Sequence, residues 1–146
     1  MSDDQHGEVS VHIGSRGFVA EIEAGEHRAI SDEPVERGGT NQGPSPYDYL
    51  LASLGSCTAI TLRMFADRKQ WPLQGVDVRL RHSRIHAEDC DDCERKTGKI
   101  DVIERVITLH GPLDPEQLAR LQQVADHCPV HKTLTNEIKI RTRFVS

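Results

Sequence analysis

Residues 44–65 read PSPYDYLLASLGSCTAITLRMF, and this stretch decides how the rest of the chain is interpreted. Ser45 suits a helix N-cap, Pro46 suits the first helical turn, and Pro72 ends the segment. Small residues fill much of the remaining surface, with Gly55 as a candidate bend, so we expect a central helix packed on several sides. Residues suited to a buried helix face recur at helical spacing: Tyr47, Leu50, Leu51, Leu54, Thr58, Thr61, Leu62 and Phe65.

The residues before this helix predict three short strands. Apolar and polar residues alternate over 9–13 and again over 18–24, and a Gly-flanked turn separates the two runs. A shorter strand is expected over 27–31. Residues 32–46 are rich in Gly, Pro, Ser, Thr and Asn, which is typical of a loop, and loops of this length in compact domains tend to be functional.

The residues after the helix predict a long hairpin over 76–110, a second helix and a last strand. Asp114 suits the N-cap of the second helix, and Gln117 stands where a capping box requires it. Alternation over 138–144 predicts the last strand. The resulting order, βββ-α-ββ-α-β, indicates an α+β fold with largely antiparallel sheet.

Composition limits the classes of function. The 146 residues suit a single domain, and the net charge of −5 argues against a nucleic-acid partner. The chain has no run of about 18 apolar residues and its first residues do not resemble a secretory signal, so we expect a cytoplasmic protein without a membrane partner. Apolar residues make up only 36% of the chain, and such a thin core suggests help from a partner subunit.

The four cysteines of a cytosolic protein are expected to be reactive or metal-binding. Cys57 lies in the central helix and Cys128 follows the second helix, which suits a pair of peroxidatic and resolving thiols. The alternative for Cys57 is a small buried residue in a tightly packed helix. His127 and His131 flank Cys128, either as thiolate or metal partners or as solvated histidines at a helix end.

The CDDC segment at 90–93 is a C-x-x-C motif near the tip of the predicted hairpin. Two thiolates and two imidazoles, with His86 and His82 nearby, could fill a tetrahedral zinc shell, so Cys90, Cys93 and His86 are candidate zinc ligands. The alternative is an exposed polar hairpin tip. A redox dithiol is disfavoured here, because the intervening aspartates oppose thiolate formation.

A reactive thiolate needs a nearby cation. Arg16, in the turn at 14–17, is the candidate, and Arg28 and Arg37 compete with it. Asp48 lies in the first turn of the central helix, where an acidic residue also serves as a capping charge.

Two longer motifs resemble the OsmC/Ohr family. GGTN at 38–41, GPSP at 43–46 and LLASLGSCT at 50–58 resemble its first cysteine motif, and ADHCPVH at 125–131 resembles its second. The resemblance covers nearly the whole chain. It implies a single OsmC-like domain over 1–146 with antiparallel sheets around central helices, in an intertwined homodimer.

The resemblance also implies an activity. Well-known family members are thiol-dependent peroxidases that reduce organic hydroperoxides and require no cofactor. A dithiol regenerates them, and a lipoyl-type dithiol is one candidate. On matching positions, Cys57 would be the peroxidatic nucleophile and Cys128 the resolving thiol. An arginine from an early turn, often of the partner subunit, stabilises the thiolate in this family, and Arg16 is its best match here.

The chain departs from the family at one position. The known peroxidases have a glutamate after the proline, which holds the arginine, and this chain has Tyr47 there. Asp48, one position later, is the candidate substitute. A different class of function therefore stays open, namely a non-catalytic metal- or ligand-binding stress protein that uses Cys90 and Cys93. A cysteine hydrolase is a weaker alternative, because no motif supplies its histidine partner or oxyanion hole.

Overall fold

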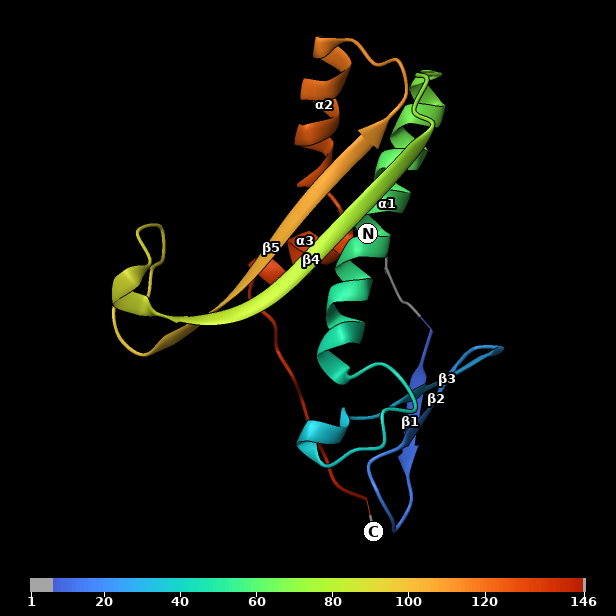
Figure 1. The fold of residues 1–146 in the computed structure, drawn as a ribbon, viewed down its shortest axis with the longest axis vertical. Coiled ribbons are helices and arrows are strands. Elements are labelled where there is room, and N and C mark those ends of the chain that lie inside the picture. Colours follow the sequence, from blue (N-terminus) through green and yellow to red (C-terminus); the bar gives the residue numbers. More distant parts are fainter. Residues whose placement is uncertain (1–6, 146) are drawn as a thin grey trace. The chain divides into compact units, whose positions relative to one another are not determined.

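The computed structural model describes residues 7–145 and shows an α+β fold with two small antiparallel sheets (Figure 1). The chain divides into two compact units, with the boundary after Leu50. The helix α1 (Pro46–Lys69) begins in the first unit and continues into the second. The α+β class with antiparallel sheets is thus confirmed, whereas the single domain over 1–146 stays a prediction.

The first unit contains a three-stranded meander. Its strands β1 (Val9–Ile13), β2 (Ala20–Ala24) and β3 (His27–Ser31) pair in the order β1-β2-β3. The predicted bounds of β1 and β3 are confirmed, but β2 begins two residues later than expected, because the residues before it form the bend after β1. Val9, Val11 and Ile13 of β1 are exposed.

A buried carboxylate organises the loop between β3 and α1. Asp32 accepts hydrogen bonds from the backbone of Glu33, Thr40 and Gln42 and from the Thr40 hydroxyl, at 2.7–3.2 Å. These bonds, from Gln42 and then Thr40, hold the pKa of Asp32 below its ordinary value. The long loop is therefore an ordered structure, and it delivers the chain to the start of α1.

A capping box starts α1. The Asp48 carboxylate accepts the Ser45 N–H at 3.0 Å, and the Ser45 hydroxyl accepts the Asp48 N–H at 3.2 Å. The N-cap expected at Ser45 is confirmed by this arrangement.

The second unit consists of a long hairpin with helices packed against it. The strands β4 (Gly75–His86) and β5 (Lys99–His110) pair without a break from Gly75↔His110 to His86↔Lys99. Figure 1 shows the curved hairpin beside α1 and α2 (Pro115–Ala125), with its tip projecting away from both helices. The tip contains the short 3-10 turn η2 (Ala87–Asp89). A second 3-10 turn, η1 (Val35–Arg37), lies in the loop between β3 and α1.

The core of the second unit lies between α1, α2 and the hairpin. It is formed by Leu62, Ala66, Leu73, Leu121, Val124 and Ala125, with Ile107 and Leu109 of β5 packed against it. Gly55 does not interrupt α1. A Cβ at this position would lie 2.7 Å from Cδ1 of Leu80, so Gly55 allows β4 to approach the helix closely. The capping box predicted for α2 is present at Asp114 and Gln117.

The prediction of a strand over 138–144 is wrong. In the described part of the chain, residues 137–145 form no strand, and a short helix, α3 (Pro129–Thr135), precedes them. The side chains of Ile140 and Phe144 are 86% and 97% exposed. Alternation of apolar and polar residues favours an extended segment, but a β-strand forms only when a neighbouring strand completes its hydrogen-bond ladder. Neither described sheet pairs with this segment.

Among the described helices, α1 is long and apolar enough to cross a membrane, with a mean hydropathy of 1.3 over an 18-residue window. Core helices of globular proteins meet the same criteria. In α1, Leu54, Thr58, Leu62 and Ala66 are buried, and 28% of the 18-residue window is buried in all. The expectation of no membrane partner stays a prediction.

Candidate active site

The second unit brings Cys57 and Cys128 together. Cys57 lies in the middle of α1 and is half-buried, whereas Cys128 is fully buried. Cys128 is the N-cap of α3, and its Sγ accepts the backbone N–H of His131 at 3.3 Å. The sequence placed Cys128 after a helix end, and the structure shows that it also begins the next helix.

The Cys128 thiol lies close enough to Cys57 to affect the acidity of Cys57. Burial is the main cause that raises the pKa of the Cys57 thiol, and the neighbouring Cys128 thiol raises it further. The backbone N–H of Val130 and the hydroxyl of Thr61 act in the opposite direction. The groups of this unit alone therefore do not favour a thiolate at Cys57.

A polar network lies behind Cys128. The Thr58 hydroxyl donates to the Leu54 carbonyl at 2.7 Å and accepts from Nη1 of Arg105 at 2.9 Å. Its oxygen is 3.9 Å from Sγ of Cys128. Arg105 also donates to the carboxylate of Asp126 at 2.9 Å. Arg105 thus ties β5 to α1 and to the end of α2 at the level of the two thiols.

Arg105 was missed by the sequence analysis, although a signal existed. In β5 it occupies the same strand face as Ile103, Ile107 and Leu109, and its side chain is only 11% exposed. A charged residue on the inward face of a strand needs a partner, and here Asp126 is that partner.

The other two residues predicted for catalysis lie in the first unit. Arg16 is exposed in the bend between β1 and β2, and Asp48 forms the capping box of α1. The capping role of Asp48 is thus directly visible. The roles of Cys57, Cys128, Arg16 and Asp48 in catalysis stay predictions.

Among the described interactions, the imidazole rings of His127 and His131 make no contact with the sulfur of Cys128. His127 is exposed, and His131 contacts Cys128 through its backbone N–H. The contact therefore comes from the start of α3 and is independent of the residue type at position 131.

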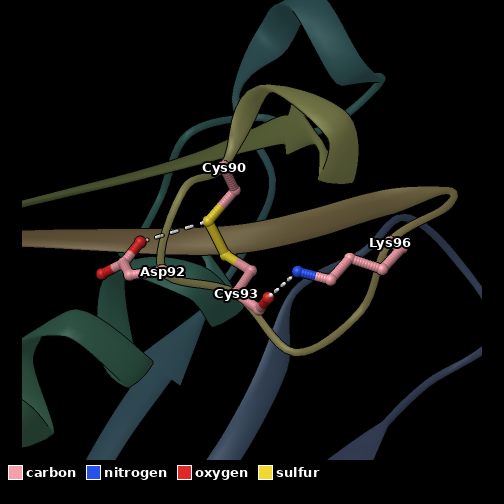
Figure 2. Close-up of a disulfide and its surroundings, with 4 residues drawn as sticks. All are labelled: Cys90, Asp92, Cys93 and Lys96. Atoms are coloured by element: carbon pink, nitrogen blue, oxygen red, sulfur yellow. Dashed lines mark hydrogen bonds between the residues drawn. A yellow bond between two sulfur atoms is a disulfide. The ribbon is translucent and has the colours of Figure 1, made fainter.

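Cys90 and Cys93 form a disulfide at the tip of the β4–β5 hairpin (Figure 2). Their Cα atoms are 5.6 Å apart. This oxidised pair differs from our expectation that the cysteines are reactive or metal-binding, and the reason is local: a two-residue spacer on a tight turn places the two sulfurs side by side.

The potential metal ligands at this tip are Cys90, Asp92 and Cys93, whose ligand atoms all lie within 4.8 Å of one another. His86, which the sequence suggested as a ligand, does not belong to this group. His82 instead pairs with Asp101 at 2.8 Å on the face of the hairpin. The residues present could hold a metal ion once the disulfide is reduced, because only a thiolate binds zinc strongly.

The fold and the site define an α+β protein with two neighbouring thiols, one on a central helix and one at the start of α3. A family model described as OsmC-like protein matches residues 39–143 of the chain. Since this match covers most of the sequence, the protein belongs to the OsmC-like family, and the resemblance noted in its two cysteine motifs is confirmed.

Solved structures support the same fold. An OsmC-like protein from Mycoplasma pneumoniae is 18% identical, with a TM-score of 0.69 over 90% of this chain and 88% of that one. A Legionella pneumophila protein described as an organic hydroperoxide resistance protein OsmC is 17% identical, with a TM-score of 0.65 over 92% of each chain. An organic hydroperoxide resistance protein from Elizabethkingia anophelis is 15% identical, with a TM-score of 0.67 over 95% of this chain and 94% of that one. No curated protein sequence matches.

Proposed function

We propose that this protein is a thiol-dependent peroxidase that reduces organic hydroperoxides in the cytoplasm. The proximity of the Cys57 and Cys128 thiols carries the proposal, because a peroxidatic and a resolving cysteine must come together to form a disulfide. Family membership and the hydroperoxide resistance described for the Legionella and Elizabethkingia proteins support it.

The proposed reaction has three steps. The Cys57 thiolate attacks the outer oxygen of ROOH, the O–O bond breaks, and the alkoxide takes a proton and leaves as ROH, so that Cys57 becomes a sulfenic acid. The Cys128 thiol then attacks this sulfur and water leaves, which produces the Cys57–Cys128 disulfide. An external dithiol, of which a lipoyl-type dithiol is one candidate, reduces the disulfide by exchange and is itself oxidised to a disulfide.

The first step requires a cation, since burial and the Cys128 thiol raise the pKa of Cys57. We propose Arg16 for this role, from the same chain or from a partner subunit. Its side chain is exposed on a bend next to glycines, so it has freedom to reach a site. Asp48 is proposed to orient this arginine in place of the family glutamate, while its carboxylate also caps α1.

We further propose that the protein is a homodimer in which the apolar residues of the C-terminal segment are covered. Ile138, Ile140, Phe144 and Val145 are all more than half exposed in the single chain, as are the apolar residues of β1. Such surfaces usually mark an interface. A second chain would also provide the partner strand that residues 138–144 lack. Light scattering of the purified protein is expected to give the mass of two chains, and a monomer would contradict the proposal.

The test of the function is the consumption of cumene hydroperoxide by purified protein with either dithiothreitol or dihydrolipoamide. We expect multiple turnovers with at least one of the two dithiols. After excess peroxide without reductant, thiol labelling and peptide mass spectrometry are expected to show a Cys57–Cys128 disulfide. A stable free thiol at Cys57 after that treatment, or no consumption with either dithiol, would contradict the proposal.

A second candidate function is metal or ligand binding without catalysis, in a stress-response protein on the same fold. The specific observation in its favour is the group formed by Cys90, Asp92 and Cys93 at the hairpin tip. Zinc is the proposed ion, because two thiolates and a carboxylate are ligands that it accepts. The two functions are separable, since they use different cysteines.

A further inference from the structure

The hairpin tip carries a second sulfur pair that the proposed peroxidase reaction does not use. Cys90 and Cys93 lie beyond the end of β4, whereas Cys57 and Cys128 lie on α1 and at the start of α3. Figure 1 shows the tip projecting away from these helices. The two pairs are therefore spatially separate within the second unit, and the hairpin pair needs an explanation of its own.

The turn that carries the pair is held by backbone hydrogen bonds. The N–H of Ala87 donates to the Gly98 carbonyl at 2.7 Å and closes the base of the tip. The N–H of Cys90 donates to the Ala87 carbonyl at 3.1 Å, and the side chain of Ala87 is buried. Breaking the S–S bond would remove one cross-link from this turn but none of these backbone bonds, so the two sulfurs would stay close together.

The side chain of Asp92 completes a three-atom ligand group. Its Oδ1 lies 3.3 Å from Sγ of Cys90, and the three potential ligand atoms lie within 4.8 Å of one another (Figure 2). Zinc binds thiolate sulfur at about 2.3 Å and carboxylate oxygen at about 2.0–2.2 Å, so small side-chain rotations suffice to bring the three atoms onto one ion. Asp92 is exposed, which leaves room for water as a fourth ligand.

The charges around the pair favour a bound cation over two free thiolates. Residues 88–94 include the carboxylates of Glu88, Asp89, Asp91, Asp92 and Glu94. The two cations that follow are engaged with the backbone: Lys96 Nζ donates to the Cys93 carbonyl at 3.3 Å, and Arg95 donates to the Lys99 carbonyl at 3.0 Å. Two additional negative charges would be repelled by these carboxylates, whereas a divalent cation would offset them.

We propose that the Cys90–Cys93 disulfide is the closed form of a redox-controlled zinc site, an inference that rests on the second candidate function and adds its control by oxidation. A dithiol reductant opens the site by exchange: the S–S bond breaks, Cys90 and Cys93 take two protons and two electrons, and the reductant becomes a cyclic disulfide. Zn²⁺ then displaces the two thiol protons and binds Cys90, Asp92, Cys93 and water. A hydroperoxide closes the site again: the O–O bond of ROOH breaks, the two zinc-bound thiolates give up two electrons and form the S–S bond, two protons from solvent complete ROH and water, and Zn²⁺ is released.

The experiment compares Zn²⁺ binding by the oxidised and the reduced protein, prepared without an affinity tag. Reduced protein is freed from dithiol without oxygen and titrated with Zn²⁺ against a chromogenic chelator. We expect one zinc per chain in the reduced protein and none at this site in the disulfide form. Addition of cumene hydroperoxide to the zinc-loaded protein is expected to release the metal.

Matched variants assign the site to the tip. Cys90→Ser with Cys93→Ser is expected to abolish zinc binding, and Cys57→Ser with Cys128→Ser is expected to retain it. Asp92→Asn is expected to weaken binding by a factor of roughly 10–100, in the range found when a metal-site partner is lost. The neighbouring Asp91→Asn is the control, because Asp91 does not belong to the ligand group.

Three outcomes would overturn the proposal: no zinc in the reduced protein, equal zinc in the oxidised and reduced forms, or zinc that survives the loss of Cys90 and Cys93. Circular dichroism of each variant separates loss of the site from loss of the fold. Because the readout is metal content, the result does not depend on the peroxidase activity, and the failure of one proposal leaves the other standing.

Discussion

Cys57→Ser is expected to lower the turnover of an organic hydroperoxide by a factor on the order of 10³ or more. A thiol is partly ionised near neutral pH and strongly nucleophilic, whereas a serine hydroxyl without an adjacent base is neither. The loss of a nucleophile removes the whole covalent pathway, and this explains the large effect. The measurement is steady-state consumption of cumene hydroperoxide with excess dithiol.

Cys128→Ser and Ser56→Ala are the matched controls. Without Cys128 the first step remains, so in the absence of dithiol this variant is expected to consume about one equivalent of peroxide and to leave a sulfenic acid on Cys57. Ser56 is the exposed neighbour of Cys57 on α1 and its hydroxyl contacts only the Ser53 carbonyl among the bonds described, at 3.3 Å. Its change to alanine is expected to leave the rate close to that of the wild type. Equal rates for Cys57→Ser and wild type would exclude the mechanism.

The pH dependence of the same step reports on the thiolate. Burial and Cys128 raise the pKa of Cys57, so the rate constant of its oxidation should increase with pH until that pKa is passed. If Arg16 supplies the counter-charge, Arg16→Met shifts this profile to higher pH and lowers the rate at neutral pH. An unchanged pH–rate profile would exclude Arg16 as the counter-charge of the Cys57 thiolate.

Gly111→Ala is expected to destabilise the protein by about 2–6 kcal/mol. Gly111 follows β5 with a φ of 126°, which alanine rarely adopts. A Cβ at this position would lie only 2.1 Å from the carbonyl oxygen of Pro72 and 3.1 Å from the backbone N of Gln74. The Gln74 N–H donates to the His110 carbonyl at 2.7 Å, so the chain segments at this point cannot separate without loss of a hydrogen bond.

Gly98→Ala is the control for the backbone conformation alone. Gly98 also has a positive φ, 82°, but a Cβ added there would have Nη1 of Arg95 as its nearest described neighbour, at 4.0 Å. This variant is expected to lose only about 1–2 kcal/mol. Urea unfolding followed by circular dichroism measures both. Equal losses would show that the close approach of Pro72 to Gly111 has no energetic consequence.

Local patterns were sufficient for most of the secondary structure. The strands over 9–13 and 27–31, the start of α1 at Ser45 and the capping box at Asp114 and Gln117 were all predicted correctly. Each of these features depends on residues that are close in sequence: alternation along a strand, apolar spacing along a helix, and side chains that bond to a backbone N–H three positions away.

The candidate site could be predicted only in part. Cys57 and Cys128 were found from their motifs, but 71 positions of sequence separate them, so no pattern could show that their thiols touch. Arg105 was overlooked because its partners, Thr58 and Asp126, come from two other elements. The Cys90–Cys93 disulfide was not expected, since the sequence indicates the spacing of two cysteines but not their oxidation state.

The sequence by itself determined the early strands, the start of α1, the cap of α2, and the two cysteine motifs that point to the family. The tertiary structure alone decided that Cys57 lies near Cys128, that Arg105 faces inward, and that residues 137–145 form no strand in the described chain. The physical reason is the separation in sequence between the groups that interact. Caps and periodicity are satisfied within a few residues, whereas a strand ladder, an ion pair between elements and a contact between two thiols all require a partner that folding brings from elsewhere.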